Sequence, residues 1–310
     1  MLAAVPAVRR LLPDLLHTAR PSVACVYTTR PKYLVFDESS EQPACVVEFG
    51  ETERLSAVEK VLAELSPRLP QTVPASLRCA HWQAGTSVHV QQGLPGTPWF
   101  RISDDLDSPS KWLALLERAS VTVASLHAAV RAVPAWSGLV YPGMELRRQA
   151  MLSRFRGVTL SSQVLTRVEE WAAEADRGGP LDSCSQHGDF SLNNLLVSRQ
   201  SIAIIDFDEF GRTRMPLHDV FGLALSMRLS QGDRCPLTTR ECISRCVAWT
   251  LGVHDAPVSA LPALLLHHLL WRINQCDGLQ RREALRRVLL RWTDELTARP
   301  EAFLGEWMSA

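Results

Sequence analysis

Short apolar runs separated by turn residues dominate the first part of the chain. Runs at 22–28, 32–37 and 44–49 are rich in valine, cysteine and aromatic residues, and prolines and polar residues separate them. Two further runs, at 76–82 and 86–91, have the same character. Apolar runs bounded by turn residues are typical of strands. We therefore expect five strands in this part of the chain.

Helical spacing of apolar residues interrupts the strands once and dominates the chain after residue 110. From Thr52 to Leu65 the apolar residues recur every three or four positions, which places them on one face of a helix. The same spacing predicts helices further on, at 110–134, 146–155, 162–175, 239–252, 258–275 and 280–298. Residues 1–20 are expected to form a short leading helix or a loose arm.

The stretch at 187–211, HGDFSLNNLLVSRQSIAIIDFDEFG, predicts two acidic loops joined by a hairpin. Apolar residues at 195–197 and 202–205 flank a polar turn at 198–201, which is a hairpin signal. Asp189 and Asn194 precede the hairpin, and Asp206 follows its second strand. The hairpin is expected to hold the loop that carries Asp189 and Asn194 beside the strand end that carries Asp206.

This arrangement suits phosphoryl transfer. The reaction needs a carboxylate near the acceptor hydroxyl and oxygen ligands that hold Mg²⁺ on the nucleotide phosphates. Asp189 is placed to accept the hydroxyl proton, and Asn194 and Asp206 are placed to hold the metal ion. Protein kinases carry the residues for the same chemistry in the motifs H-R-D-x-x-x-x-N and D-F-G. In this sequence Gly188 replaces the arginine, and Asp208 is either a second metal contact or a solvated acid.

At these residues the chain resembles the aminoglycoside phosphotransferase and choline kinase families, which are small-molecule kinases with a protein-kinase-like fold. HGDFSLNNLL matches their H-G-D-x-x-x-x-N motif, and IIDFDEFG matches their I-D-x-x-x-x-G metal strand. The resemblance implies a bilobal α+β fold with a small β-rich N-lobe at 1–95 and a larger, mostly helical C-lobe at 96–310. It implies phosphorylation of a small-molecule hydroxyl, with ATP or GTP as co-substrate and Mg²⁺ as cofactor.

The resemblance also implies roles for residues around the motifs. The turn QQGLPG becomes the hinge, at about 91–96, where backbone groups of Gln92 and Leu94 would hydrogen-bond to the adenine ring. His187 would brace the catalytic loop, and Asp219 would tie the following helix back to that loop. His127, in the Leu-His pair that relatives share, is expected to pack in the core.

The small lobe departs from the family pattern at the third strand. Relatives carry a lysine there that contacts the nucleotide phosphates, whereas ACVVEFG places Glu48 at that point, and Glu59 is the helix acid that would face it. The first turn, TTRPK, contains no glycine. Three explanations stay open: the strand alignment is shifted, Lys32 or Arg30 supplies the charge from the neighbouring strand, or nucleotide binding is altered or lost.

The last of these explanations leads to an alternative function, a catalytically silent pseudokinase that acts as a binding or regulatory module. A third activity, transfer of a nucleotidyl group to a protein, keeps the fold and changes the chemistry. The intact set of Asp189, Asn194 and Asp206 favours the phosphotransferase.

Composition narrows the partners. The 310 residues are 46% hydrophobic, as expected for a globular chain, and the 33 basic residues balance 33 acidic ones, which argues against binding to nucleic acid. The N-terminal segment contains prolines and charges and predicts neither a signal peptide nor a membrane span, so we expect a cytoplasmic protein without membrane contact.

The cysteines lack C-x-x-C spacing. Cys242, Cys246 and His254 could form a metal site, but buried free thiols are the simpler interpretation.

The acceptor is expected to be a small hydroxylated metabolite or an antibiotic. Drug-modifying relatives attract polycations with acidic surfaces, whereas this chain has 13 arginines and 10 acidic residues from Arg212 to its end. That balance weighs against a polycationic aminoglycoside. Trp271, on a predicted helix of the acceptor region, is either a stacking surface or a core aromatic.

Overall fold

A computed structural model of the chain describes residues 21–27, 30–38, 40–231, 236–250, 256–276 and 280–305. The expected leading segment at 1–20 and His254 lie outside these residues. The strands are β1 (Ser22–Tyr27), β2 (Pro31–Phe36), β3 (Pro43–Glu51), β4 (Ser76–Gln83), β5 (Thr86–Gln92), β6 (Thr97–Pro98), β7 (Ser137–Val140), β8 (Leu181–Cys184), β9 (Leu195–Val197) and β10 (Ile202–Ile204). The helices are α2 (Thr52–Leu65), α3 (Trp99–Ile102), α4 (Pro109–Arg131), α5 (Pro142–Phe155), α6 (Ser162–Gly178), α7 (His218–Gln231), α8 (Thr239–Thr250), α9 (Leu261–Asn274), α10 (Gln280–Ala298) and α11 (Pro300–Leu304).

The chain divides into two compact units. The first contains the described residues up to Asp104 together with Asn193–Asp208, and the second contains Asp105–Leu192 and the described residues from Glu209 onward. The sequence places a single boundary between residues 95 and 96. The first unit reaches further along the chain because β6 pairs with β9, so the β9–β10 hairpin folds with the N-terminal strands.

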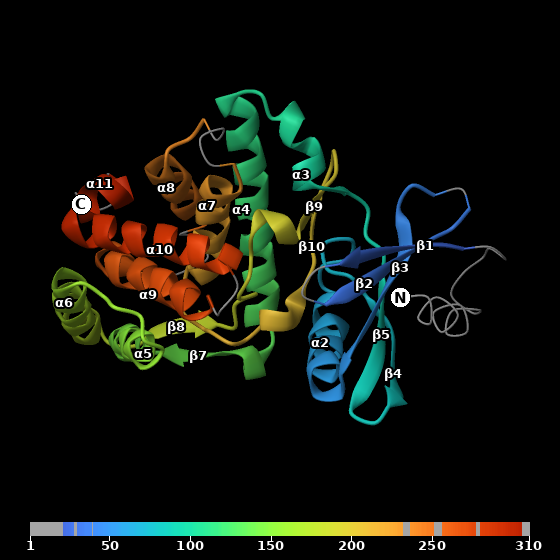
Figure 1. Cartoon of the computed structure of the whole chain (residues 1–310), viewed down its shortest axis with the longest axis horizontal. Coiled ribbons are helices and arrows are strands. Elements are labelled where there is room, and N and C mark those ends of the chain that lie inside the picture. Colours follow the sequence, from blue (N-terminus) through green and yellow to red (C-terminus); the bar gives the residue numbers. More distant parts are fainter. Residues whose placement is uncertain are drawn as a thin grey trace. The chain divides into compact units, whose positions relative to one another are not determined.

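The first unit is built on an antiparallel sheet with the strand order β1-β2-β3-β5-β4, and α2 packs against β3, β4 and β5 (Figure 1). Valines at 35, 47, 88 and 90 are fully buried in the sheet. The buried face of α2 is made of the apolar positions that predicted it, from Leu55 to Leu65. This helix begins and ends at the predicted residues.

A smaller sheet in the first unit, with the order β10-β9-β6, carries the predicted hairpin. Gly96, just before β6, has a φ of +134°, and a Cβ there would lie 2.9 Å from the backbone carbonyl carbon of Leu196. The close approach of the two chains therefore requires glycine at the end of the predicted hinge turn.

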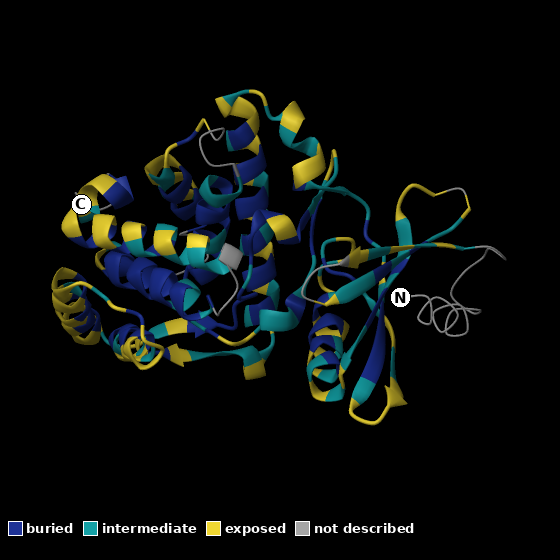
Figure 2. Ribbon diagram, in the orientation of Figure 1, coloured by how far each residue is buried: buried dark blue, intermediate teal, exposed yellow. Residues whose placement is uncertain are grey.

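The second unit is mostly helical, with one two-stranded antiparallel sheet in which β7 pairs with β8. Helix α9 is buried along nearly its whole length, and it contacts α5, α6, α7 and α10 (Figure 2). Among the described residues, α4 is the one helix with the length and hydropathy that a membrane span would need. Its inner face, from Trp112 to Val130, is buried, and it contacts α7 and α8, so α4 has the packing of a core helix.

Candidate active site

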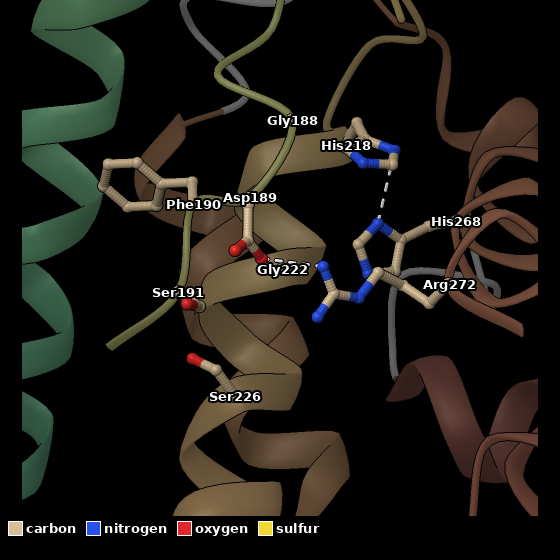
Figure 3. A pocket seen from close by; sticks show the side chains of 9 residues that line it. All are labelled: Gly188, Asp189, Phe190, Ser191, His218, Gly222, Ser226, His268 and Arg272. Carbon is tan, nitrogen blue, oxygen red and sulfur yellow. Dashed lines mark hydrogen bonds and ion pairs between the residues drawn. The ribbon is translucent and has the colours of Figure 1, made fainter. Parts of the chain in front are cut away.

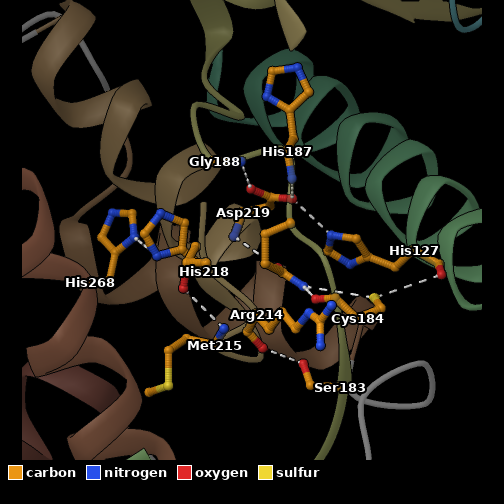
Figure 4. Close-up of polar contacts among 12 residues, drawn as sticks. His127, Ser183, Cys184, His187, Gly188, Arg214, Met215, His218, Asp219 and His268 are labelled. Carbon is orange, nitrogen blue, oxygen red and sulfur yellow. Dashed lines mark hydrogen bonds and ion pairs between the residues drawn. The ribbon is translucent and has the colours of Figure 1, made fainter. Parts of the chain in front are cut away.

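Asp219 anchors the loop that begins at His187. It lies in the first turn of α7 and is fully buried. Its Oδ2 accepts hydrogen bonds from the backbone N–H of His187 at 2.7 Å and from Nε2 of His127 at 2.8 Å, and its Oδ1 accepts one from the N–H of Gly188 at 2.9 Å (Figure 4). His127 is a core histidine, as expected, and it also holds the carboxylate that fixes the loop.

Asp219 stays ionised although its side chain is buried. Burial alone would raise the pKa of this carboxyl, but the hydrogen bond from His127 and the electrostatic interaction with the same ring hold the pKa well below its ordinary value. A charged acceptor forms stronger hydrogen bonds than a neutral one. The two backbone N–H groups just before Asp189 are therefore held firmly.

Gly188 is required by the shape of the loop. Its φ is +86°, and a Cβ at this position would lie 2.4 Å from the backbone oxygen of Glu209. A residue with a side chain would strain the backbone and collide with that oxygen. This explains why the arginine of the protein-kinase motif has no counterpart at this position. His187, just before it, is fully buried, and its ring packs edge-on against Phe190 at 6.0 Å.

Asp189 forms an ion pair with an arginine that the sequence did not single out. Nη1 of Arg272, on α9, lies 2.7 Å from Oδ1 of Asp189 (Figure 3). The side chains of Arg272 and Asp189 are 25% and 36% exposed, so both reach the surface. The pocket beside them is lined by Gly188, Asp189, Phe190, Ser191, His218, Gly222, Ser226, His268 and Arg272.

Neutral imidazoles form one wall of this pocket. Nδ1 of His218 and Nδ1 of His268 lie 3.3 Å apart, so one ring donates a hydrogen bond to the other. Burial lowers the pKa of His218 to about 4 and lowers the pKa of His268 well below its ordinary value. Behind them, both ring nitrogens of His267 and the indole Nε1 of Trp271 are buried without a hydrogen-bond partner among the described residues. Trp271 stacks on His267 at 6.0 Å between ring centroids.

The two expected metal ligands, Asn194 and Asp206, are neighbours in the first unit. The backbone N–H of Ile205 donates to the carbonyl oxygen of Asn194 at 3.0 Å, which joins the loop to the end of β10. Asp206 has a φ of +69°. Aspartate tolerates this left-handed conformation better than most residues do, and such backbone outliers cluster at functional sites.

Lys32 contacts the same strand end. Its Nζ lies 3.1 Å from Oδ1 of Asp206 and 3.9 Å from Oε2 of Glu48. Lys32 and Glu48 are directly opposite each other in the β2–β3 ladder. Lys32 therefore lies one strand away from the strand on which the family pattern places a lysine.

Glu48 is buried and paired with cations rather than with the acid of α2. Its carboxylate contacts the guanidinium of Arg54, whose Nη1 lies 2.6 Å from Oδ1 of Asp208. Burial raises the pKa of Glu48, and the charges of Lys32 and Arg54 oppose that rise. Burial and the neighbouring carboxylate of Glu59 raise the pKa of the Cys79 thiol, so Glu59 lies beside that thiol. The expected clash of two unpaired acids does not occur.

Asp208 is not a solvated acid. Its carboxylate contacts Arg54 and also the Nη1 of Arg30, and its side chain is 17% exposed. Sequence reasoning missed Arg54. It could have been found from its place in the first turn of the helix that follows β3, six residues after an unmatched buried acid. No comparable sequence signal points to Arg272.

The predicted hinge lies at the end of β5. The N–H of Gln92 donates to the carbonyl oxygen of Ala75 at 2.8 Å, and the N–H of Gly93 donates to Ala44 at 3.0 Å. The side chain of Leu94 is buried. The N–H of Gln92 is thus already used in a backbone hydrogen bond.

The donor set of the expected metal site is chemically suitable. Asn194 and Asp206 offer side-chain oxygen atoms, which Mg²⁺ prefers, and this ion usually binds to one or two protein ligands together with phosphate and water oxygens. Within the described ranges, no group of three or more His, Cys, Asp or Glu side chains could hold a metal ion. Cys242 and Cys246 are buried free thiols, which agrees with the simpler interpretation of the cysteines.

The sequence-predicted residues fall in both units. His187, Asp189 and Asp219 belong to the second unit. The first unit contains the others: Lys32, Gln92, Leu94, Asn194 and Asp206. In the second unit the structure brings together Asp219 and the loop that begins at His187, and in the first unit it brings together Lys32, Asn194 and Asp206.

Comparisons with known proteins agree with this fold. A model of the phosphotransferase enzyme family matches residues 31–240. No curated protein matches the sequence. A choline/ethanolamine kinase family protein from Mesorhizobium loti has a similar structure, with a TM-score of 0.61 at 15% identity over 100% of this chain and 98% of that chain.

Two aminoglycoside phosphotransferases are also similar in structure. APH(4)-Ia, in a ternary complex with AMP-PNP and hygromycin B, has a TM-score of 0.62 at 14% identity over 94% of this chain and 97% of that chain. APH(3'')-Id from Streptomyces rimosus, in complex with ADP and streptomycin, has a TM-score of 0.54 at 17% identity over 87% of this chain and 97% of that chain. These similarities confirm the predicted α+β kinase-like fold.

Proposed function

Because this chain belongs to the phosphotransferase enzyme family, we propose that it transfers the γ-phosphate of ATP or GTP to a hydroxyl group of a small molecule. The observation that carries the proposal is the buried, charged Asp219, which holds the two N–H groups just before Asp189. A loop held in this way presents a carboxylate at a defined position, and this is what a general base requires.

In the proposed reaction Asp189 orients the acceptor hydroxyl and accepts its proton. The acceptor oxygen forms a bond to the γ-phosphorus as the bond between that phosphorus and the leaving diphosphate oxygen breaks. The side chain of Asp189 is 36% exposed, so a hydroxyl group can reach it. His187 and Asp219 are positioning residues, because they act through the loop and not on the substrate.

Asn194 and Asp206 are proposed to hold Mg²⁺. Their side-chain oxygen atoms would hold the ion, which would supply positive charge to offset that of the nucleotide phosphates. The backbone hydrogen bond from Ile205 to Asn194 supports this assignment, because it keeps the two oxygen donors on neighbouring segments. Asp206 pairs with Lys32 at 3.1 Å, so the site already balances the carboxylate with a cation.

Lys32 is proposed to bind the nucleotide phosphates. Its position opposite Glu48 and its contact with Asp206 support the explanation in which the cation comes from the neighbouring strand. Arg54 forms an ion pair with the carboxylate of Glu48. The positive charge of its guanidinium reduces the repulsion that a phosphate group would meet there. For the base, the carbonyl group of Gln92 and the N–H of Leu94 are the proposed partners.

A silent binding module is the second candidate. The observation that favours it is Glu48 itself, a buried acid at the strand position where the family carries a lysine. In this case the chain would bind nucleotide weakly or not at all, and Asp189 would have no catalytic role. For either function we propose a cytoplasmic protein whose partners are small molecules and not nucleic acid or a membrane.

Isothermal titration calorimetry tests the proposal. The protein is titrated with ATP and with GTP, each with and without Mg²⁺, beside Asp206→Ala and, as a matched control, Asp37→Ala, an acid at the end of β2 outside the site. We expect binding that depends on Mg²⁺ and is lost only in Asp206→Ala. Absence of binding for both nucleotides would favour the silent module. Nucleotide binding of equal affinity with and without Mg²⁺ would refute the assignment of Asn194 and Asp206 as metal ligands.

A further inference from the structure

The pocket beside Asp189 contains one cation and one anion. Of the residues that line it, Asp189 and Arg272 carry charge, and both reach the surface. His218 and His268 are held neutral by burial, and the remaining lining residues are glycine, serine and phenylalanine. The pocket therefore offers an incoming cation no carboxylate beyond the proposed general base.

The ion pair occupies the atoms that catalysis needs. Nη1 of Arg272 lies 2.7 Å from Oδ1 of Asp189, and Figure 3 shows the guanidinium pointing at the carboxylate. A hydroxyl group that donates to Oδ1 of Asp189 competes with this guanidinium for that oxygen atom. The loop is already held by Asp219, so Arg272 is not needed to fix its backbone.

The pocket is too small to enclose an acceptor molecule. The enclosed space is about 20 Å³, which suffices for one water molecule and not for a metabolite. An acceptor must therefore approach the exposed edges of Asp189 and Arg272. Guanidinium groups bind carboxylates and phosphates through two parallel hydrogen bonds. Arg272 has five N–H donors, and its contact with Oδ1 of Asp189 is made through Nη1.

Resting on the proposed phosphotransferase activity, we propose that the acceptor is an anion, a hydroxylated metabolite whose carboxylate or phosphate group binds to Arg272. This anionic group draws the guanidinium toward itself and leaves Oδ1 of Asp189 to accept the hydroxyl hydrogen bond. A cationic acceptor meets Arg272 as a like charge. The pocket thus selects for charge opposite to that of an aminoglycoside.

The test compares matched ligands that differ in charge. Binding of gluconate is measured against glucitol, and binding of glucose 6-phosphate against glucose, by competition in saturation-transfer NMR, with hygromycin B as the cationic probe. These measurements need no turnover. We expect at least one anion to bind about tenfold to a hundredfold more tightly than its uncharged partner, which is typical of a charge-assisted hydrogen-bonding pair.

Variants assign the preference to the residue. Arg272→Gln should reduce the preference to about twofold or less, and Arg272→Lys should keep part of it, because lysine retains the charge without the bidentate geometry. Arg291→Gln is the control, since Arg291 is an exposed arginine on α10. It should leave the preference unchanged. Circular dichroism of each variant shows whether it is folded.

Three results would overturn the inference: equal binding of anions and their uncharged partners, an anion preference that survives in Arg272→Gln, or tighter binding of hygromycin B than of every anion. Titration of the same preparations with Mg²⁺ and nucleotide separates the two proposals. Nucleotide binding without anion preference refutes the anionic acceptor alone. Anion binding through Arg272 without nucleotide binding refutes the phosphotransferase alone.

Discussion

Replacing Asp219 by asparagine is expected to loosen the catalytic loop. The carboxylate accepts hydrogen bonds from the N–H groups of His187 and Gly188 and from the ring of His127. Asparagine has the same shape but a single acceptor atom, so its NH₂ group must face at least one of these donors. The variant therefore loses the charge and leaves a buried N–H without an acceptor.

The magnitude follows from these bonds. A hydrogen bond to a charged group contributes about 1.5–3 kcal/mol, and an unsatisfied buried donor costs about 1–3 kcal/mol. Because the remaining acceptor keeps part of the interaction, we expect a loss of about 3 kcal/mol. Such a loss raises the population of the open loop about a hundredfold.

Hydrogen exchange followed by mass spectrometry measures this opening directly. The peptide that contains His187 and Gly188 should exchange about a hundredfold faster in Asp219→Asn, because exchange from a transiently open state tracks its population. Asp182→Asn is the control, since Asp182 is a largely exposed acid that forms a surface ion pair with Arg131. It should exchange like the unmodified protein. Equal exchange in all three proteins would refute the brace.

Two further predictions concern the nucleotide site and the buried histidines. Lys32→Ala should weaken the binding of Mg²⁺ and nucleotide about tenfold to a hundredfold in calorimetry, as expected for loss of a cation that contacts phosphate. The control Lys60→Ala, on the exposed face of α2, should leave the affinity unchanged. If Lys32→Ala binds nucleotide with the affinity of the unmodified protein, Lys32 is not part of the site. Stability should fall as the pH is lowered from about 6.5 toward 4, because His218, His267 and His268 stay neutral in the folded protein, where burial lowers each pKa, and take up protons when it unfolds. Each such histidine removes about 1.4 kcal/mol per pH unit in this range, so a melting temperature that is unchanged between pH 7.5 and pH 4.5 would contradict the buried neutral state.

Local patterns were enough to predict most of the larger elements. The helix Thr52–Leu65 has the predicted bounds, and β4, β5 and the β9–β10 hairpin differ from prediction by one residue at most. These segments combine a clear period with proline, glycine or polar residues at their ends. The short elements β6, β7, β8, α3 and α11 were not predicted, because two to five residues are too few to show a period.

The ion pairs between residues far apart in the sequence could not be predicted from local patterns. Arg54 reaches Asp208 across 154 positions of the chain, and Arg272 reaches Asp189 across 83. Pairs this distant depend on the packing of whole elements. The position of Lys32 beside Glu48 was accessible, because the pairing of these two residues is a local consequence of the hairpin between β2 and β3. The expected face-to-face acids failed because a cation from the first turn of α2 was overlooked.

Transfer of labelled phosphate tests the central claim most directly. The protein is incubated with γ-³²P-labelled ATP or GTP, Mg²⁺ and a panel of hydroxylated small molecules, both anionic and neutral, and label is sought in the small-molecule fraction. The intact mass of the protein is measured in parallel, because a nucleotidyl adduct keeps the α-phosphate, releases the γ-phosphate in pyrophosphate and so carries no γ-label. The account predicts labelled small molecule that disappears with Asp189→Asn and when Mg²⁺ is removed. A nucleotidyl adduct on protein would contradict the chemistry. Label transfer that persists in Asp189→Asn would show that Asp189 is not the general base.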